Sequence, residues 1–180
     1  SLDAAGLKLF QITIMVDIAP DKQAYDPRLK EVLALVKGRG VQFALLMNGM
    51  KLSDPAGDER AVSVIREISN LGKDTGAQFL LYPHTDFWME RIEDCIRVAD
   101  KVNRPDVGVM FNLCHWLRVS KDRDCGAPLK KAMPRLMAMR DSSTRSSRGP
   151  APLLSISTTL PARSPISSRR FSPLCRSPPH

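Results

Sequence analysis

The sequence lacks the long apolar runs that mark a membrane protein. None of its hydrophobic stretches approaches the ~18 residues that a transmembrane helix needs. It also lacks a basic segment followed by a short apolar one near its start, so no signal peptide is recognisable. The first residue is Ser rather than Met, which is compatible with a start inside a longer protein and with a targeting segment upstream. We expect no membrane partner.

Cysteine pairs and common catalytic signatures are absent as well. Cys95, Cys114, Cys125 and Cys175 show no CxxC spacing, and no P-loop, GxGxxG, GxSxG or HExxH occurs. We expect Cys95 to lie on the apolar face of a helix and Cys114 at the end of a strand. Buried, reduced thiols fit a reducing compartment, so the sequence predicts a cytoplasmic protein.

The net charge of +8 suggests a nucleic-acid partner, but its distribution argues against one. From Arg140 to His180 the chain has seven Arg, one Asp and no Lys or Glu, so this segment carries +6. The remaining 139 residues carry only +2. The basic character therefore belongs to the tail, and we do not expect the folded part to bind nucleic acid.

Apolar strand patterns alternate with amphipathic helix patterns through most of the chain. Strands are predicted at Leu7–Ile18, at Val41–Met47, from Phe79 onward and at Val107–Phe111. Strand starts roughly thirty residues apart are typical of βα units. The sequence therefore predicts an α/β fold with about four parallel βα units, in an open sheet or in part of a (β/α)₈ TIM barrel.

Helix signals separate these strands. Asp26-Pro27 begins one helix, and an apolar stripe at Ala61, Ile65 and Ile68 predicts another. The segment after His84 repeats apolar residues at helical spacing and predicts a third helix. A short fourth helix is expected around Pro128–Met137.

The pattern ends near Met139. We assign residues 1–138 to the partial barrel and 139–180 to a Ser/Arg/Pro-rich tail that we expect to be disordered. Its eleven Ser and seven Pro leave too little apolar surface to offset the entropy of ordering. The tail is either a natural segment for acidic partners or the product of a frameshift in GC-rich coding DNA, and we favour the frameshift.

Two strands end in polar clusters that contain a histidine. LLYPHTDFW places His84 after the third strand, and DVGVMFNLCHW places Asn112 and His115 after the fourth. Parallel strands bring both histidines to the same edge of the sheet, where α/β proteins carry their chemistry. An imidazole with a pKa near 6.5 can polarise a hydroxyl or a carbonyl. The alternative is that each histidine is structural and bonded to backbone.

Three further residues are candidates for substrate binding. Trp88 and Trp116 could stack on a sugar ring, although Trp88 also fits the helix core. Asn48 ends the second strand and could hydrogen-bond a substrate, or form a turn with Gly49. The carboxylates Asp86, Glu90 and Glu93 fit a solvated helix start better than a catalytic acid.

The two quoted motifs resemble the xylose-isomerase-like TIM-barrel superfamily, over residues 2 to about 136. The resemblance implies that the four strands are the second to fifth of eight. It also implies a divalent metal, Mn²⁺, Mg²⁺ or Zn²⁺, held by carboxylates and a histidine. Tyr82 occupies a Glu position of that ligand set, and Asn112 matches the Asp of a DxxH pattern whose histidine, here His115, contacts substrate. Asn112 is then the candidate metal ligand of this chain, and without negative charge it binds a hard cation weakly.

The resemblance implies a sugar (phosphate) isomerase or epimerase that moves a proton next to a carbonyl, with His84 and His115 as candidate catalytic groups. The expected partner is a small sugar or sugar phosphate. Because later ligands are missing, we expect this chain by itself to be inactive or nearly so. A non-catalytic carbohydrate-binding or scaffold barrel is the alternative, and kinship with endonuclease IV is a third hypothesis. Unpaired strand edges make self-association possible.

Overall fold

One parallel β-sheet organises the chain, and the computed structural model describes residues 3–140 and 154–156 of it. Its strand order is β5-β4-β3-β2-β1-β6, and each pairing between neighbours is parallel. The strands are β1 (Leu9–Asp17), β2 (Gln42–Asn48), β3 (Gln78–Leu81), β4 (Val107–Asn112), β5 (Leu136–Arg140) and β6 (Leu154–Ile156). The predicted α/β fold of a partial barrel is confirmed, with a fifth βα strand that the sequence pattern did not predict.

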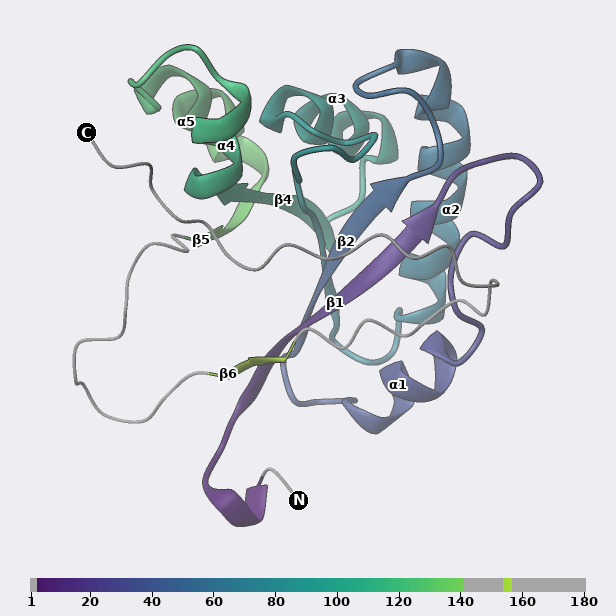
Figure 1. Ribbon diagram of the computed structural model, residues 1–180. Coiled ribbons are helices and arrows are strands. Elements are labelled where there is room, and N and C mark those ends of the chain that lie inside the picture. Colours follow the sequence, from purple (N-terminus) through teal and green to yellow (C-terminus); the bar gives the residue numbers. More distant parts are fainter. Residues whose placement is uncertain (1–2, 141–153, 157–180) are drawn as a thin grey trace, which may run out of the picture.

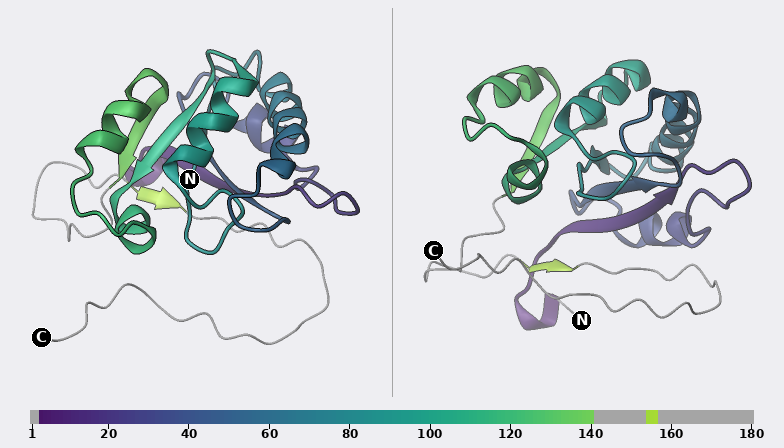
Figure 2. Two further views of the ribbon diagram at one scale, coloured as in Figure 1. Left: turned by 90° about the horizontal axis from the view of Figure 1, so that it is seen from above. Right: turned by 45° about the horizontal axis from the view of Figure 1, so that its top comes forward.

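Helices cover one face of this sheet (Figures 1 and 2). The α-helices are α1 (Leu29–Leu35), α2 (Asp58–Leu71), α3 (Ile92–Val102), α4 (Leu113–Val119) and α5 (Gly126–Ala132). Short 3₁₀ turns lie at η1 (Asp3–Ala5), η2 (Pro55–Gly57) and η3 (Met133–Arg135). Among the residues that the structure describes, no helix is long and apolar enough to cross a membrane.

The alternation of side chains along each strand divides the core in two. On β2, Phe43, Leu45 and Met47 point to the helices, whereas Ala44 and Leu46 point to the opposite face. The opposite face forms a smaller apolar cluster, here called the inner cluster, which consists of Ala44, Leu46, Leu80, Tyr82 and Met110, with Phe87, Met137 and Ala138 packed against it. This face carries the interior surface of the partial barrel.

A buried carboxylate couples α2 to α3. Asp58 is 1% exposed and accepts hydrogen bonds from Arg97 Nε at 2.9 Å and Lys101 Nζ at 2.8 Å. Burial alone raises the pKa of Asp58, but these two cations outweigh it and hold the pKa below its usual value. The pairing fixes the two helices side by side on the sheet.

Several predicted boundaries are wrong. The helix after His84 begins only at Ile92, because residues 82–91 form a loop whose backbone is bonded to β2. The helix expected around Pro128–Met137 ends at Ala132, and the chain continues through η3 into β5. Cys114 lies in α4 rather than at a strand end. Most of the tail predicted to be disordered lies outside the described residues, and residues 154–156 pair with β1 as β6.

The contact of β5 with β4 depends on a glycine, which yields a first prediction. A Cβ atom at Gly108 would lie 2.6 Å from the carbonyl oxygen of Arg135 and 2.5 Å from Met137 Cγ. The Arg135 carbonyl can only retreat if η3 and the start of β5 move, so Gly108→Ala should lower the free energy of unfolding by about 1–3 kcal/mol. Urea unfolding measures this, with Met139→Ala as the control, because the Met139 side chain is 68% exposed. Equal stability of the two variants would contradict the tight approach.

Candidate functional site at the carboxyl edge of β3 and β4

The candidate site lies where β3 and β4 end. Tyr82 directly follows β3 and donates its backbone N–H to Leu45 O at 3.1 Å, which continues the ladder toward β2. Asn112 is the last residue of β4. With a period of two, Tyr82 and Asn112 both fall on the inner face of the sheet, and parallel pairing places them at the same edge.

Asn112 joins the two strand ends through its side-chain amide. The side chain is fully buried, and its Nδ2 donates to the Tyr82 hydroxyl at 2.8 Å. Its Oδ1 accepts the backbone N–H of His115 at 3.2 Å and so caps the N-terminus of α4. The Asn-x-x-His spacing is therefore that of a helix cap. His115 lies in the first turn of α4, and its backbone N–H is the group that donates to the capping side chain of Asn112.

Thr85 connects the two histidines. His84 Nδ1 lies 2.8 Å from the Thr85 carbonyl oxygen. His115 Nδ1 lies 3.4 Å from the Thr85 amide nitrogen and 3.1 Å from Thr85 Oγ1. The two imidazole centroids are 4.0 Å apart, and the Tyr82 ring stands edge-on to both. The predicted convergence of the two imidazoles is confirmed.

Burial and positive neighbours keep this cluster neutral. Burial, then the neighbouring His84, and then the cations Arg118 and Arg140 lower the pKa of His115 from 6.5 to about 4. Burial likewise lowers the pKa of His84, although its hydrogen bond to the Thr85 carbonyl opposes the shift. Burial raises the pKa of Tyr82 despite the Asn112 hydrogen bond and the charge of Arg140. Near pH 7 the cluster therefore presents neutral hydrogen-bonding groups beside two guanidinium groups.

The other sequence candidates do not take part in the hydrogen bonds of this cluster. Trp88 is fully buried in the loop before α3 and donates from Nε1 to Asp54 O at 2.8 Å, so its ring packs in the core. Trp116 is 8% exposed and packs against Phe111, with ring centroids 6.1 Å apart. Asn48 is exposed at the end of β2. The structure thus brings together His84, Asn112 and His115. Trp116 meets Asn112 only at a small cavity, and Asn48 and Trp88 lie elsewhere.

A small cavity adjoins the cluster at Asn112, and neither histidine lines it. It offers about 60 Å³ to water-sized molecules, and Pro83, Asn112 and Trp116 line it together with Glu90 and Glu93. This volume holds only a few water molecules and is too small for a sugar. A bound sugar would therefore also have to contact residues outside the cavity, along the carboxyl edge of the sheet.

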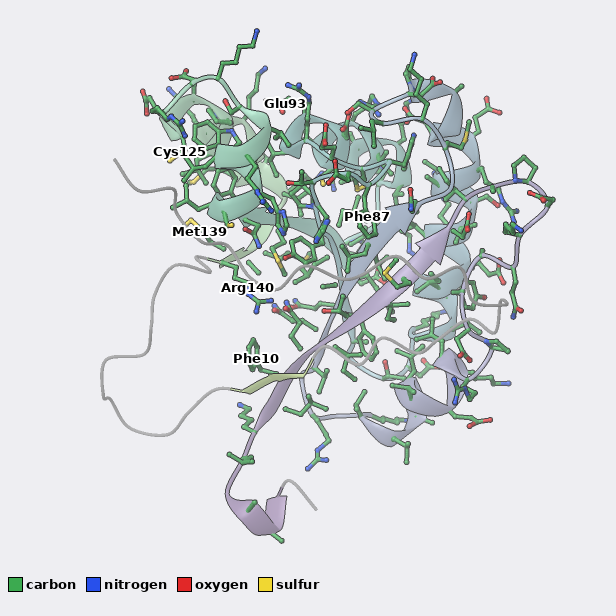
Figure 3. All side chains as sticks on the ribbon, viewed as in Figure 1. Phe10, Phe87, Glu93, Cys125, Met139 and Arg140 are labelled. Carbon is green, nitrogen blue, oxygen red and sulfur yellow. The ribbon has the colours of Figure 1, made fainter. Side chains whose placement is uncertain are left out.

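Sequence reasoning did not select three residues at this edge. Thr85 bridges the histidines through backbone and hydroxyl, which residue type alone does not reveal. Arg118 lies three residues after His115, a helical spacing that becomes visible only once α4 is known. Arg140 pairs with Asn112 across β4 and β5, but the sequence pattern assigned it to the tail. Figure 3 shows the Arg140 side chain projecting from β5 toward the middle of the sheet.

The residues at this edge do not fit the divalent metal that the resemblance implies. Asn112 uses its oxygen on the α4 cap and its nitrogen on Tyr82, and Tyr82 is a phenol with a raised pKa. Hard divalent cations prefer carboxylate oxygens. Within residues 3–140 and 154–156, no group of three or more His, Cys, Asp or Glu side chains is arranged to hold a metal ion.

The lowered pKa of His115 predicts a pH-dependent stability. Between pH 6.5 and about 4 the unfolded chain binds a proton that folded His115 excludes. The free energy of unfolding is therefore highest above pH 6.5 with respect to this group, and it decreases as the pH falls toward 4. The decrease should be on the order of 2 kcal/mol, allowing for partial solvent exposure. Urea unfolding between pH 4 and 7.5 measures it. His115→Gln should flatten the dependence, and equal pH profiles for the two proteins would refute the assignment.

Comparison with known proteins identifies the family of the chain and structures of similar fold. No curated protein matches the chain. Among solved structures, 3-keto-D-glucoside 4-epimerase from E. coli is 12% identical, with a TM-score of 0.63 over 79% of this chain and 61% of that one. D-allulose 3-epimerase from Methylomonas sp., in complex with D-allulose, is 14% identical, with a TM-score of 0.62 over 78% of this chain and 54% of that one.

The probable 3-DHS dehydratase from Bacillus anthracis is 16% identical, with a TM-score of 0.60 over 77% of this chain and 52% of that one. At such identities these likenesses concern the fold, and the chain spans about half the length of the structures it matches. The family match itself covers residues 2–150. The chain belongs to the xylose isomerase-like TIM barrel family.

Proposed function

We propose that this chain carries the sugar-recognising edge of an isomerase or epimerase that moves a proton at a carbon next to a carbonyl. The observation that supports it most is the convergence of His84, His115 and Tyr82 around Asn112 at the carboxyl edge of a parallel sheet. Donors and acceptors at this edge match the hydroxyl and carbonyl oxygens of a sugar. Solved structures of similar fold include epimerases crystallised with D-fructose or D-allulose.

Recognition and net turnover are separate properties of this chain. Five βα strands supply one part of the edge, whereas a closed barrel of this type uses strand ends around its whole circumference. We therefore propose that the chain binds a sugar or sugar phosphate but interconverts aldose and ketose slowly or not at all. The Arg118 and Arg140 guanidinium groups beside His115 suit a phosphate or another anionic group on the ligand.

A binding or scaffold protein without catalysis is the second candidate function. The hydrogen bond between Tyr82 and Asn112 favours it, because it engages the two positions that the resemblance assigns to metal ligands. Under this alternative the edge recognises sugar, and no bond of the ligand is broken. Net turnover and sugar binding must therefore be measured independently of each other.

Calorimetry with D-fructose, D-allulose and fructose 6-phosphate tests recognition. We expect weak binding of at least one sugar, reduced about 3- to 10-fold by His115→Ala because a hydrogen bond is lost. Leu35→Ala is the control, since the Leu35 side chain is 78% exposed on α1. Absence of binding to all three sugars would overturn the proposal. Robust aldose–ketose interconversion with added Mn²⁺ or Mg²⁺ that is lost in His115→Ala would overturn the expectation of little turnover.

A further inference from the structure

Hydrogen bonds to Thr85 determine which nitrogen of His84 carries a proton. His84 Nδ1 lies 2.8 Å from the Thr85 carbonyl oxygen, which can only accept. Nδ1 therefore carries the hydrogen, and Nε2 of the neutral ring keeps an unprotonated lone pair. No hydrogen-bond partner of His84 Nε2 occurs among residues 4–140.

The same residue imposes the opposite tautomer on His115. The Thr85 backbone N–H can only donate, and it points to His115 Nδ1 at 3.4 Å. The Thr85 hydroxyl, 3.1 Å away, can donate to the same nitrogen. Nδ1 is therefore the unprotonated nitrogen, so neutral His115 carries its hydrogen on Nε2. The contacts with Thr85 thus leave His84 Nε2 as a hydrogen-bond acceptor and His115 Nε2–H as a hydrogen-bond donor.

Tyr82 supplies a second donor. Asn112 Oδ1 accepts from His115 N–H, which fixes the amide orientation, so Nδ2 is the atom that donates to the Tyr82 oxygen. Because the Tyr82 oxygen acts as the acceptor in this bond, its own hydroxyl hydrogen is available for donation to another group. In the part of the chain that the structure describes, no acceptor for it is found.

We propose that this edge catalyses metal-independent proton abstraction from a carbon next to a sugar carbonyl, with His84 as the base and His115 and Tyr82 as hydrogen-bond donors to the carbonyl oxygen. This inference rests on the proposed sugar site. His84 Nε2 takes the proton, the electron pair of the C–H bond forms the C=C bond of an enediolate, and the carbonyl π pair moves to the oxygen. The two donors stabilise that oxygen. Return of a proton from His84 to the same carbon closes the cycle with no net oxidation.

The charges that face the cluster support these roles. Burial and Arg118 of α4 lower the pKa of His84, while the Thr85 carbonyl and Asp86 oppose them, so the ring is unprotonated near neutral pH. Arg118 and Arg140, from α4 and β5, act electrostatically on His115, and their positive charge would favour negative charge on the oxygen to which His115 donates. A single base serves a single face of the carbon. A proton, or a deuteron acquired from solvent, therefore returns to the face that lost it, so the expected reaction is hydrogen exchange without net epimerisation.

The tautomers can be tested without any ligand. A long-range ¹H–¹⁵N NMR spectrum of the full chain at pH 7 should show His84 with a protonated Nδ1 and His115 with a protonated Nε2. The same tautomer on both site histidines, or a protonated His84 Nε2, would overturn the assignment of base and donor.

The reaction is tested by deuterium incorporation into D-fructose in D₂O containing EDTA. The full chain should exchange the hydrogens next to the carbonyl faster than buffer does. His84→Gln should lower the enzymatic rate by at least ~100-fold, the scale of general-base catalysis, and Tyr82→Phe by about 10-fold. Tyr82→Phe retains the ring that packs in the inner cluster, and circular dichroism checks the fold of both variants. Leu35→Ala should exchange at the rate of the unaltered chain.

The outcomes separate this inference from the proposed function. Sugar binding in the calorimeter without deuterium exchange would overturn proton abstraction and leave the binding alternative. Exchange that disappears in EDTA and returns with Mn²⁺ would overturn metal independence. Exchange that survives in His84→Gln would overturn the role of His84. Failure to bind sugar would overturn both the inference and the proposed function.

Discussion

The buried amide of Asn112 is the interaction on which the site depends. Its two polar atoms have different structural roles. Oδ1 caps the N-terminus of α4 by accepting the His115 backbone N–H, and Nδ2 donates a hydrogen bond to the Tyr82 hydroxyl. A buried amide left with one unpaired end costs about 1–3 kcal/mol, so the two contacts maintain each other. The helix start that positions His115 and the strand end that positions Tyr82 are therefore parts of one arrangement.

This arrangement has a chemical consequence for the edge of the sheet. Carboxylates at positions 82 and 112 would repel one another unless a cation lay between them, whereas Tyr82 and Asn112 attract through a neutral hydrogen bond. The family fold is thus retained, while Tyr82 and Asn112 differ from the carboxylate ligands that the resemblance implies for these positions. Two guanidinium groups, Arg118 and Arg140, supply positive charge beside the histidines from the protein itself.

Helix packing explains why a partial barrel can still present an ordered edge. The apolar residues of β1 to β4 that face the helices form one continuous core, and the Asp58 network joins α2 to α3 at its periphery. The inner face is smaller and is built around Leu80, Tyr82 and Met110, with Phe87 from the loop after β3 packed against it. The loop that carries His84 and Thr85 is thereby anchored from both sides, by β2 backbone and by the inner cluster.

The residue pattern alone predicts the strands β1 to β4, their parallel order and the edge to which His84, Asn112 and His115 belong. These are consequences of local apolar runs and of connection length, both of which are properties of short segments. Helix starts were less predictable: the loop of residues 82–91 has a helical apolar spacing, yet backbone hydrogen bonds to β2 override it. The strand β5 is short and follows a 3₁₀ turn, and it is stabilised by pairing with β4 rather than by its own pattern.

Which atoms of these residues meet depends on the three-dimensional packing. From sequence alone, Trp88 could either stack on a sugar ring or pack in the core. Its complete burial and its hydrogen bond to Asp54 O, next to η2, show that it packs in the core. The tautomers of His84 and His115 depend on where the Thr85 carbonyl, amide and hydroxyl point, which no residue pattern encodes. Arg140 reaches the site because β5 pairs with β4, a long-range contact. The physical reason is that hydrophobic period is local along the chain, whereas hydrogen-bond direction and charge proximity arise between segments that are distant in sequence.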